Sequence, residues 1–194
     1  MRRPMHLLSV LALAFSACAM SVRVDANSMD PQRVAEPFFL DAFYAWDSKA
    51  LDAMMSGNAE GDDIRYYQGW AQGANYQVVS RPPCDLVDTG NSVAQVTCAV
   101  TVTDDFGRAL GYRATDTFRL SIANAQVVAV SFAGDDPPIF AEMFDWIGQQ
   151  RPDVLLGPCH LMFTGGETPG LCAKAVARSA KDFMRERVRS GAKE

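Results

Sequence analysis

The sequence predicts an α+β fold in which N-terminal helices pack on an antiparallel sheet and a C-terminal helical appendage follows. Three observations predict this class. Apolar residues recur at helical spacing over about 31–74, they alternate with polar residues over 93–133, and helical spacing returns after residue 137. Helices and strands in separate runs are typical of α+β proteins. The chain has 194 residues, 48% hydrophobic and 21% charged, which is ordinary globular composition.

The first residues have the pattern of a secretory signal. Arg2 and Arg3 precede an apolar run from Leu7 to Phe15, and small residues follow at 16–19. A positive start, an apolar core and a small-residue cleavage region are the three parts of a signal peptide. We therefore expect residues 1–18 to be a signal peptide and the protein to be exported, as a cell-envelope lipoprotein or as a periplasmic or secreted protein.

Two cleavage sites compete at the end of this segment. The A-x-A pattern Ala17-Cys18-Ala19 would remove Cys18 with the signal, whereas residues 15–18 resemble the bacterial lipoprotein box, in which Cys18 carries the lipid. The cysteine count favours lipidation, because an even set of four remains once Cys18 is set aside. Residues 19–30 are then a flexible polar tether, and a lipid anchor at Cys18 makes the membrane a partner.

The other four cysteines predict two local disulfides, which persist in exported proteins. If Leu86 pairs opposite Val96, Cys84 falls opposite Cys98 and within disulfide reach. The second expected pair brackets a glycine-rich loop and consists of Cys159 and Cys172. The alternative is a zinc site of cysteines with His160, but its spacing lacks any C-x-x-C. We expect no metal and no cofactor.

Three helices are expected before the sheet. The first begins near Asp30-Pro31, and one of its apolar faces contains Phe39, Phe43, Trp46 and Ala50. The second begins at Asp47 or Ser48, runs through Met55 and ends at Gly57-Asn58. The third starts at Asp62 or Asp63 and stops before Tyr76.

A change of period then predicts a four-stranded antiparallel meander. One strand passes through residues 76–79, and three alternating strands cover 93–103, 112–122 and 126–133. Hairpin turns are expected at residues 104–107 and 123–125. Clean alternation indicates antiparallel strands with one buried face, and the early helices would cover that face.

Residues 137–194 are expected to form a helical extension that contains the second disulfide loop. One helix follows Pro137-Pro138, and a basic helix runs to about Val188. Residues 172–194 carry seven Lys or Arg against three Asp or Glu, which we interpret as a solvated helix face, the alternative being contact with an anionic surface. The whole chain has a net charge of −5, so nucleic acid is not an expected partner.

This order of elements resembles the nuclear transport factor 2-like superfamily, also called SnoaL-like. The matching stretches are residues 34–55, 63–79 and 93–134, within a predicted domain at 31–136. The resemblance implies a cone-like fold, in which a curved antiparallel sheet wraps around the N-terminal helices. The superfamily includes isomerase-like and cyclase-like enzymes and also non-catalytic exported modules, so the fold alone fixes function only weakly.

Asp116 is the strongest candidate for chemistry. It is in phase with Phe118, Leu120 and Ile122, which places it on the apolar side of the predicted sheet. Burial would raise the pKa of this carboxyl, as a general base or a buried hydrogen-bond donor requires. The structural alternative is that Asp116 bonds an Arg, a Tyr or a helix N-terminus. The candidate hydroxyl donors beside it are Tyr44, Tyr67 and Tyr112.

Other polar residues have simpler interpretations. We expect Asp62-Asp63 at a helix N-terminus, Asp135-Asp136 in a turn, and His160 exposed on its loop. Trp46 and Trp70 are expected in the core. Ser179 lacks the sequence context of a catalytic serine.

Together these features predict an exported, non-catalytic envelope module that binds a partner protein or a small apolar ligand. The alternative is an exported isomerase, dehydratase or cyclase-type enzyme that uses Asp116 and a Tyr in the cone pocket. The two differ in one observable, because the enzyme requires Asp116 and a Tyr hydroxyl to open onto the same cavity.

Overall fold

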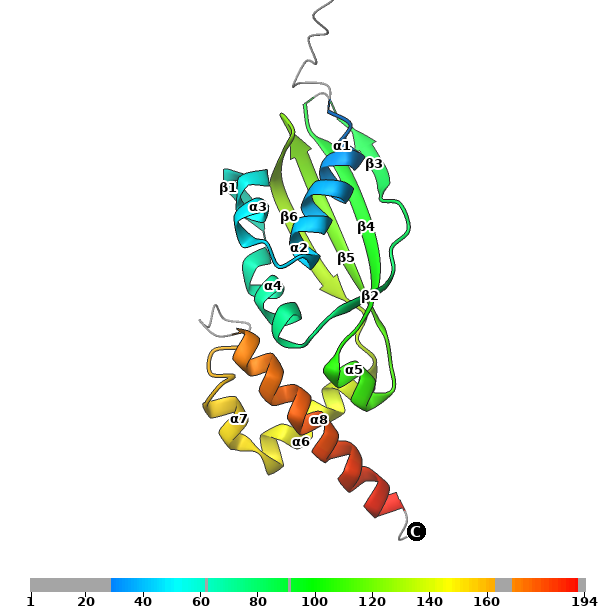
Figure 1. Cartoon of the computed structure of the whole chain (residues 1–194), viewed down its shortest axis with the longest axis vertical. Helices are drawn as coiled ribbons and strands as arrows, with labels where there is room; N and C mark the ends of the chain where they lie inside the picture. The colour runs from blue at the N-terminus through cyan, green and yellow to red at the C-terminus, as the bar shows by residue number, and fades with distance from the viewer. Residues whose placement is uncertain (1–28, 62, 91, 163–168, 192–194) are drawn as a thin grey trace, which may run out of the picture.

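The computed structural model describes residues 29–61, 63–90, 92–162 and 169–191. Helices from the first part of the chain cover one face of a curved sheet, and further helices follow the last strand (Figure 1). The predicted α+β class is confirmed. The predicted signal peptide, its Cys18 and residues 19–28 of the tether lie outside the described residues. Within the described ranges, no helix is both long and apolar enough to cross a membrane.

The N-terminal helical segment has three consecutive parts, which are α1 (Pro31–Arg33), the π-helix η2 (Val34–Leu40) and α2 (Asp41–Tyr44). Asp30 caps its start, since its carboxylate accepts a hydrogen bond from the Gln32 N–H at 3.0 Å. Pro37 lies in the π-helical part, where its missing N–H removes one regular helical bond. Phe39 and Phe43 are fully buried and pack edge-on against Phe118 of the sheet.

The next segment differs from the prediction in one element. Asp47 caps α3 (Ser48–Met54), as the sequence predicts. The chain from residue 55 onward, expected to finish that helix at Gly57-Asn58, instead forms the edge strand β1 (Met55–Gly61). This strand pairs in parallel with β6, so its backbone bonds are supplied by the sheet rather than by a helix. Asp63 caps α4 (Ile64–Gly73), while its neighbour Asp62 lies outside the described residues.

The sheet has six strands in the order β1-β6-β5-β4-β2, with β3 also paired to β4. The bounds after β1 are β2 (Gln77–Ser80), β3 (Asp85–Thr89), β4 (Ala94–Thr103), β5 (Ala114–Ala123) and β6 (Gln126–Gly134). The predicted meander of four strands corresponds to β2, β4, β5 and β6, and the sheet contains β1 and β3 in addition. Along β4 and β5, alternate side chains are buried as expected, because one face meets the helices and the other faces solvent.

The two expected turns have different outcomes. Asn124 and Ala125 both have positive φ, 51° and 59°, which forms the tight β5–β6 hairpin that the sequence predicts. Residues 104–107 do not form a tight turn. They begin a short helix, α5 (Asp105–Leu110), which Asp104 caps by accepting a hydrogen bond from the Gly107 N–H. The cap favours a helix over a turn at this point. The helix in turn buries the side chain of Phe106, which is 1% exposed.

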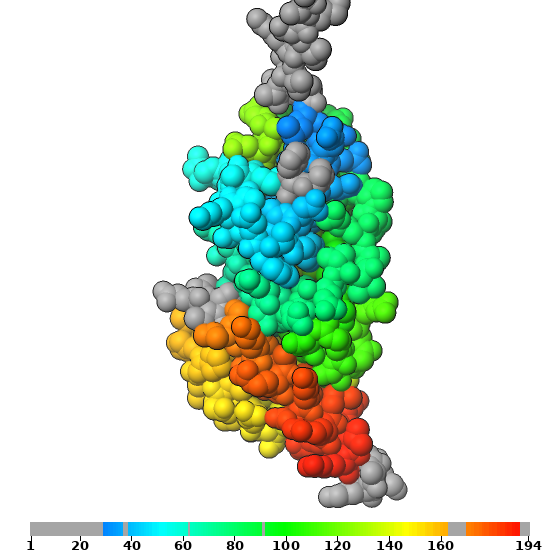
Figure 2. Space-filling model, viewed as in Figure 1, coloured from blue at the N-terminus to red at the C-terminus, as the bar shows by residue number. Residues whose placement is uncertain are grey.

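The C-terminal extension consists of α6 (Pro138–Gln150), α7 (Pro152–Leu156) and α8 (Pro169–Gly191). It forms the lower part of the elongated molecule in Figure 2, and α8 packs against α4 and α5 (Figure 1). The crossing is close at Gly73, where an added Cβ would lie 2.4 Å from the Gly170 Cα. Met143, Ile147 and Val176 are fully buried in the core of this part.

Both expected disulfides are present. Leu86 pairs with Val96 in the β3–β4 register, and Cys84 is bonded to Cys98 beside them, with Cα atoms 4.4 Å apart. Cys159 is bonded to Cys172, with Cα atoms 4.5 Å apart. Because these four cysteines are bonded in pairs, their thiolates are not free to bind zinc as the alternative requires. Moreover, no group of three metal-ligating side chains occurs within the described ranges. His160 is exposed, as expected.

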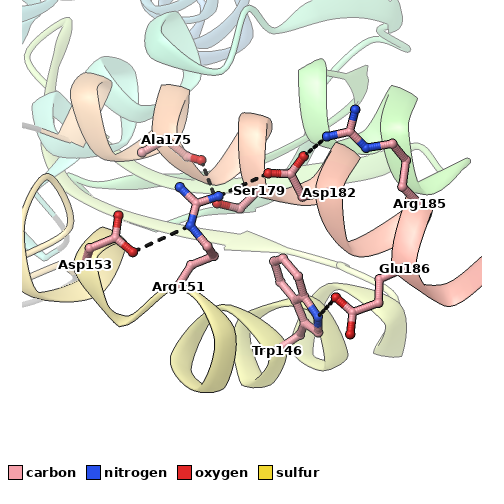
Figure 3. Close-up of polar contacts among 8 residues, drawn as sticks. All are labelled: Trp146, Arg151, Asp153, Ala175, Ser179, Asp182, Arg185 and Glu186. Carbon is pink, nitrogen blue, oxygen red and sulfur yellow. Dashed lines mark hydrogen bonds and ion pairs between the residues drawn. The ribbon is translucent and has the colours of Figure 1, made fainter.

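Polar contacts hold the basic helix α8 against α6 and α7 (Figure 3). Arg151 lies 3.5 Å from Asp153 and 3.0 Å from Asp182, and the Trp146 indole donates to Glu186 at 3.1 Å. Ser179 is buried, and its hydroxyl donates to the Ala175 carbonyl one turn earlier. The helix therefore uses part of its polar face for attachment to its neighbours.

Candidate functional site

Asp116 is buried on the helix-covered face of the sheet, as its phase in β5 predicts. Its side chain is 2% exposed, and Oδ2 accepts a hydrogen bond of 2.7 Å from the Tyr44 hydroxyl of α2. In the strand register, Asp116 lies between Val100 of β4 and Gly134 of β6. An added Cβ at Gly134 would lie 3.4 Å from Oδ2 of Asp136.

A cavity of about 190 Å³ opens next to this carboxylate. It is lined by residues of α4, α5 and α6 together with the start of β5 and the end of β6. Its walls are mostly aromatic, formed by Tyr67, Trp70, Tyr76, Phe106, Phe132 and Phe140. Asp116 lies at its buried end, whereas Ala133, Gly134 and Asp136 are exposed and form its mouth.

The aromatic walls are packed against one another. The rings of Tyr67 and Phe132 have centroids 4.5 Å apart, and Phe106 lies between Trp70 at 5.9 Å and Phe140 at 5.5 Å. These spacings fall within the range of favourable aromatic contacts. The side chains that face the cavity are therefore held by neighbours on other elements.

The electrostatic environment of the cavity is negative. The pKa of Asp116 is raised to about 7, mainly by burial and also by the nearby carboxylates Asp136 and Asp135, while the Tyr44 hydrogen bond acts in the opposite direction. Burial also raises the pKa of Asp136, with Asp135 adding to the shift and the Tyr112 hydrogen bond opposing it. In the part of the chain that the structure describes, no ion pair includes Asp116 or Asp136.

The candidate tyrosines occupy different positions around this site. Tyr44 holds Asp116 from the helix side, and Tyr67 forms part of the cavity wall. The Tyr112 hydroxyl donates to Asp136 at 3.3 Å, so it contacts the carboxylate at the mouth rather than Asp116. Burial raises the pKa of Tyr44, and Asp116 raises it further, so this hydroxyl stays protonated and donates.

Several cavity residues were not expected from the sequence. Asp136 was assigned to a turn, and Tyr76 only to a strand start, yet both line the cavity. Trp70 was expected in the core and is 6% exposed, and it also forms part of the cavity wall. Trp46, which was likewise expected in the core, is only half-buried. Asp135 retains a structural role, because it accepts a hydrogen bond from the Thr115 N–H.

Two larger hollows lie elsewhere. One of about 380 Å³ is lined by β1 and the start of α4, and one of about 520 Å³ is lined by Trp146 of α6 and by residues of α8. Both are lined mostly by exposed side chains, and neither includes the buried carboxylate. The cavity at Asp116 is therefore the better candidate, because it combines a buried charge with enclosing apolar walls.

No family model matches the sequence, and no curated protein matches it. Among solved structures, a Xanthomonas campestris protein of unknown function with a cystatin-like fold is 14% identical, with a TM-score of 0.39 over 56% of this chain and 92% of its own. A candidate polyketide cyclase from Silicibacter is 16% identical, with a TM-score of 0.37 over 60% and 91%. A Mycobacterium tuberculosis protein of unknown function is 9% identical, with a TM-score of 0.41 over 78% and 92%.

Proposed function

We propose that the protein is an exported, non-catalytic module of the SnoaL-like fold that binds a small ligand in the cavity at Asp116. The observation that carries this proposal is a cavity lined by six aromatic residues and by one buried carboxylate. Concave, mostly apolar sites with a few polar groups are typical of small-molecule binding. The superfamily assignment is supported by the order of helices and strands and by helices covering one face of a curved sheet.

The size of the cavity limits the ligand. At about 190 Å³ it exceeds the ~150 Å³ cavity that holds benzene in an engineered protein core. It is smaller than the ~300–1,000 Å³ of sites for drug-sized molecules. The ligand that fits best is therefore about the size of one substituted ring or a short branched chain, or one such group of a larger molecule that extends through the mouth.

The proposal of export is supported by the two disulfides, which are typical of oxidising compartments. In this proposal, Cys18 carries a lipid that attaches the module to a membrane, and an envelope protein is an alternative partner. Mass spectrometry of the mature N-terminus, from membranes and from medium, tests this directly. A lipid on Cys18 is the expected result, and an unmodified N-terminus at residue 20 contradicts the anchor.

An enzymatic function is the second candidate, and one observation favours it. Asp116 and Tyr76 line the same cavity, and the pKa of Asp116 is raised to about 7, near the value that suits a general base at neutral pH. Such an enzyme would abstract a proton with Asp116 in an isomerase, dehydratase or cyclase-type reaction. A ligand that binds in the cavity and is not converted would support the non-catalytic module, whereas its conversion would support the enzyme.

Fluorine NMR of fluorotryptophan-labelled protein tests whether the cavity binds ligands. Trp70 lines the cavity, whereas Trp146 on α6 is bonded to Glu186 of α8 and lines the separate hollow there, so its signal is an internal control that reports binding elsewhere. With benzyl alcohol as a ring-sized probe, we expect a saturable shift of the Trp70 signal and none of the Trp146 signal. Replacement of Trp70 by Phe assigns the signal. A probe that leaves Trp70 unshifted, or shifts both signals equally, contradicts the proposed site.

A further inference from the structure

The chemistry of the cavity points to a class of ligand, and this step rests on the proposed function. We infer that the cavity binds a small organic cation, such as a quaternary ammonium group, which the aromatic side chains surround and the carboxylates neutralise. The inference rests on three features of the cavity: its aromatic walls, the position of its two carboxylates, and the charges around them.

The aromatic walls are suited to a cation. Six of the residues that line the cavity are aromatic, and the cavity is narrow enough for a bound group to contact several of them. The π-face of an aromatic ring attracts a cation within about 6 Å of its centroid, and the attraction is larger when water is excluded. Methyl groups on nitrogen spread the positive charge and also bury apolar surface, so both contributions favour an alkylated ammonium.

Two carboxylates line the cavity and differ in their exposure. Asp116 is buried, whereas Asp136 is exposed. The Tyr44 hydroxyl bonds one oxygen of Asp116, and the Tyr112 hydroxyl bonds Asp136. Both carboxylates thus have neutral hydrogen-bond donors, which position them but supply no positive charge. A cation bound in the cavity would therefore be attracted by both carboxylates.

The negative charges around the cavity disfavour other classes of ligand. The charged groups that shift the pKa of Asp116 are themselves carboxylates, Asp135 and Asp136. A buried carboxylate without a counter-charge is costly, and a bound cation relieves that cost, whereas an anion would increase it. A hard metal ion prefers six or more oxygen ligands, which aromatic walls do not offer. A neutral apolar molecule would fill the space without pairing with either carboxylate.

A matched pair of probes tests the class of ligand. Choline carries a trimethylammonium group. Its uncharged isostere is 3,3-dimethylbutan-1-ol (dimethylbutanol), which has a quaternary carbon in place of the nitrogen. We expect choline to shift the Trp70 fluorine signal and to bind at least about tenfold more tightly than dimethylbutanol. Equal or tighter binding of dimethylbutanol would overturn the inference and leave the proposed binding function intact.

Charge-removing variants locate the effect. Asp116→Asn keeps an acceptor for Tyr44 and should weaken choline binding about tenfold without changing the affinity for dimethylbutanol. Asp136→Asn at the exposed mouth should weaken choline binding less, by about threefold, and it provides a second test should the buried variant not fold. Asp145→Asn, on the exposed side of α6, is the matched control and should change neither affinity.

The outcomes separate the two levels of the proposal. Binding of benzyl alcohol at Trp70 without binding of choline overturns the cationic ligand and keeps the cavity as a binding site. Failure of benzyl alcohol, choline and dimethylbutanol to shift Trp70 overturns both. If Asp116→Asn and Asp136→Asn leave the affinity for choline unchanged, the carboxylates do not recognise the charge and the inference fails.

Discussion

Tyr44 donates its hydroxyl to Asp116 across 2.7 Å, joining α2 to β5 over 72 positions of sequence. This bond links the N-terminal helical segment to the centre of the sheet at the buried end of the cavity. It holds one oxygen of the carboxylate in place and opposes the rise in its pKa that burial causes.

Removing this hydrogen bond should destabilise the protein most when Asp116 is ionised. We expect Tyr44→Phe to lower the free energy of unfolding by about 1.5–3 kcal/mol at pH values well above 7, since a bond to a charged acceptor is lost. Below about pH 5 the loss should be smaller, because Asp116 is protonated there. Urea unfolding at both pH values provides the measurement. In a double-mutant cycle with Asp116→Ala, which removes the acceptor, additive effects would contradict the coupling.

The buried carboxyl should also make stability fall as pH rises. The pKa of Asp116 in the folded state is raised to about 7 from its ordinary value of 3.8, so the folded protein binds this proton more tightly than the unfolded chain. Its contribution is fully present below about pH 4 and is lost as pH rises to about 7, by on the order of 3 kcal/mol or less.

Asp116→Asn should therefore flatten the fall in stability between these pH values, as measured by urea unfolding. Asp104, whose pKa is also raised to about 7 mainly by burial, will keep part of the slope. The surface variant Asp145→Asn is the control and should retain the wild-type profile. An unchanged slope in Asp116→Asn would show that this carboxyl does not carry the effect.

Ligand affinity should have the opposite pH dependence. The titratable groups that interact with Asp116 are the hydroxyls of Tyr44 and Tyr76 and the carboxylates Asp104, Asp135 and Asp136. As Asp116 ionises near pH 7, the attraction for a permanently charged cation increases, so the Kd of choline should fall between about pH 6 and 8. Titration calorimetry at several pH values measures this change. The dependence should weaken in Asp116→Asn, and a flat profile in the wild type would argue against Asp116 as the counter-charge.

The disulfide between Cys159 and Cys172 should stabilise the extension. It closes a loop of 13 residues, which in the chain-entropy model corresponds to about 3 kcal/mol. We expect the paired replacement by Ala to lower the free energy of unfolding by about that amount, measured by guanidinium unfolding. Paired replacement of Cys84 and Cys98, which span a similar separation of 14 residues, is the comparison and should cost a similar amount. Unchanged stability in either variant would contradict the estimate for that bond.

The close approach of α4 and α8 should not tolerate a side chain. In Gly73→Ala, the new methyl group would meet the Gly170 backbone at 2.4 Å, so the helices must separate, at a cost of about 1–3 kcal/mol. Thermal unfolding measures the loss. Gly57→Ala is the control, because nothing lies within 4 Å of its added Cβ. Equal melting temperatures for both variants would show that this crossing is not tight.

The parts of the fold that the sequence predicts are those with strong periodicity. Val96, Val100 and Phe118 alternate with polar neighbours, and this pattern correctly places Asp116 on the buried face. Strand β1 escaped prediction because Met55–Gly61 has no alternation of apolar residues, and its extended form depends on pairing with β6. Helix α5 was missed because Asp-Asp-Phe-Gly also has the composition of a turn, although Asp104 is a typical cap.

The candidate site was only partly predictable for a related reason. Burial of Asp116 follows from its strand, but the cavity beside it depends on contacts between distant elements. Phe106 and Phe140 reach the cavity from α5 and α6, and neither helix has a motif that indicates a site. Asp136 follows the last strand by two residues, so its place at the mouth depends on the direction in which α6 leaves the sheet.

The position of Phe140 in the cavity wall would, in the proposed function, give the C-terminal extension a part in selecting the ligand. This ring belongs to the segment after residue 137, whereas Asp116 belongs to the sheet. A chain that ended with β6 would present an open depression beside its carboxylate, and the added helices convert that depression into a chamber. Substitutions confined to α6 would then alter the width of the entrance, so one sheet could serve different occupants as its appended helices diverge.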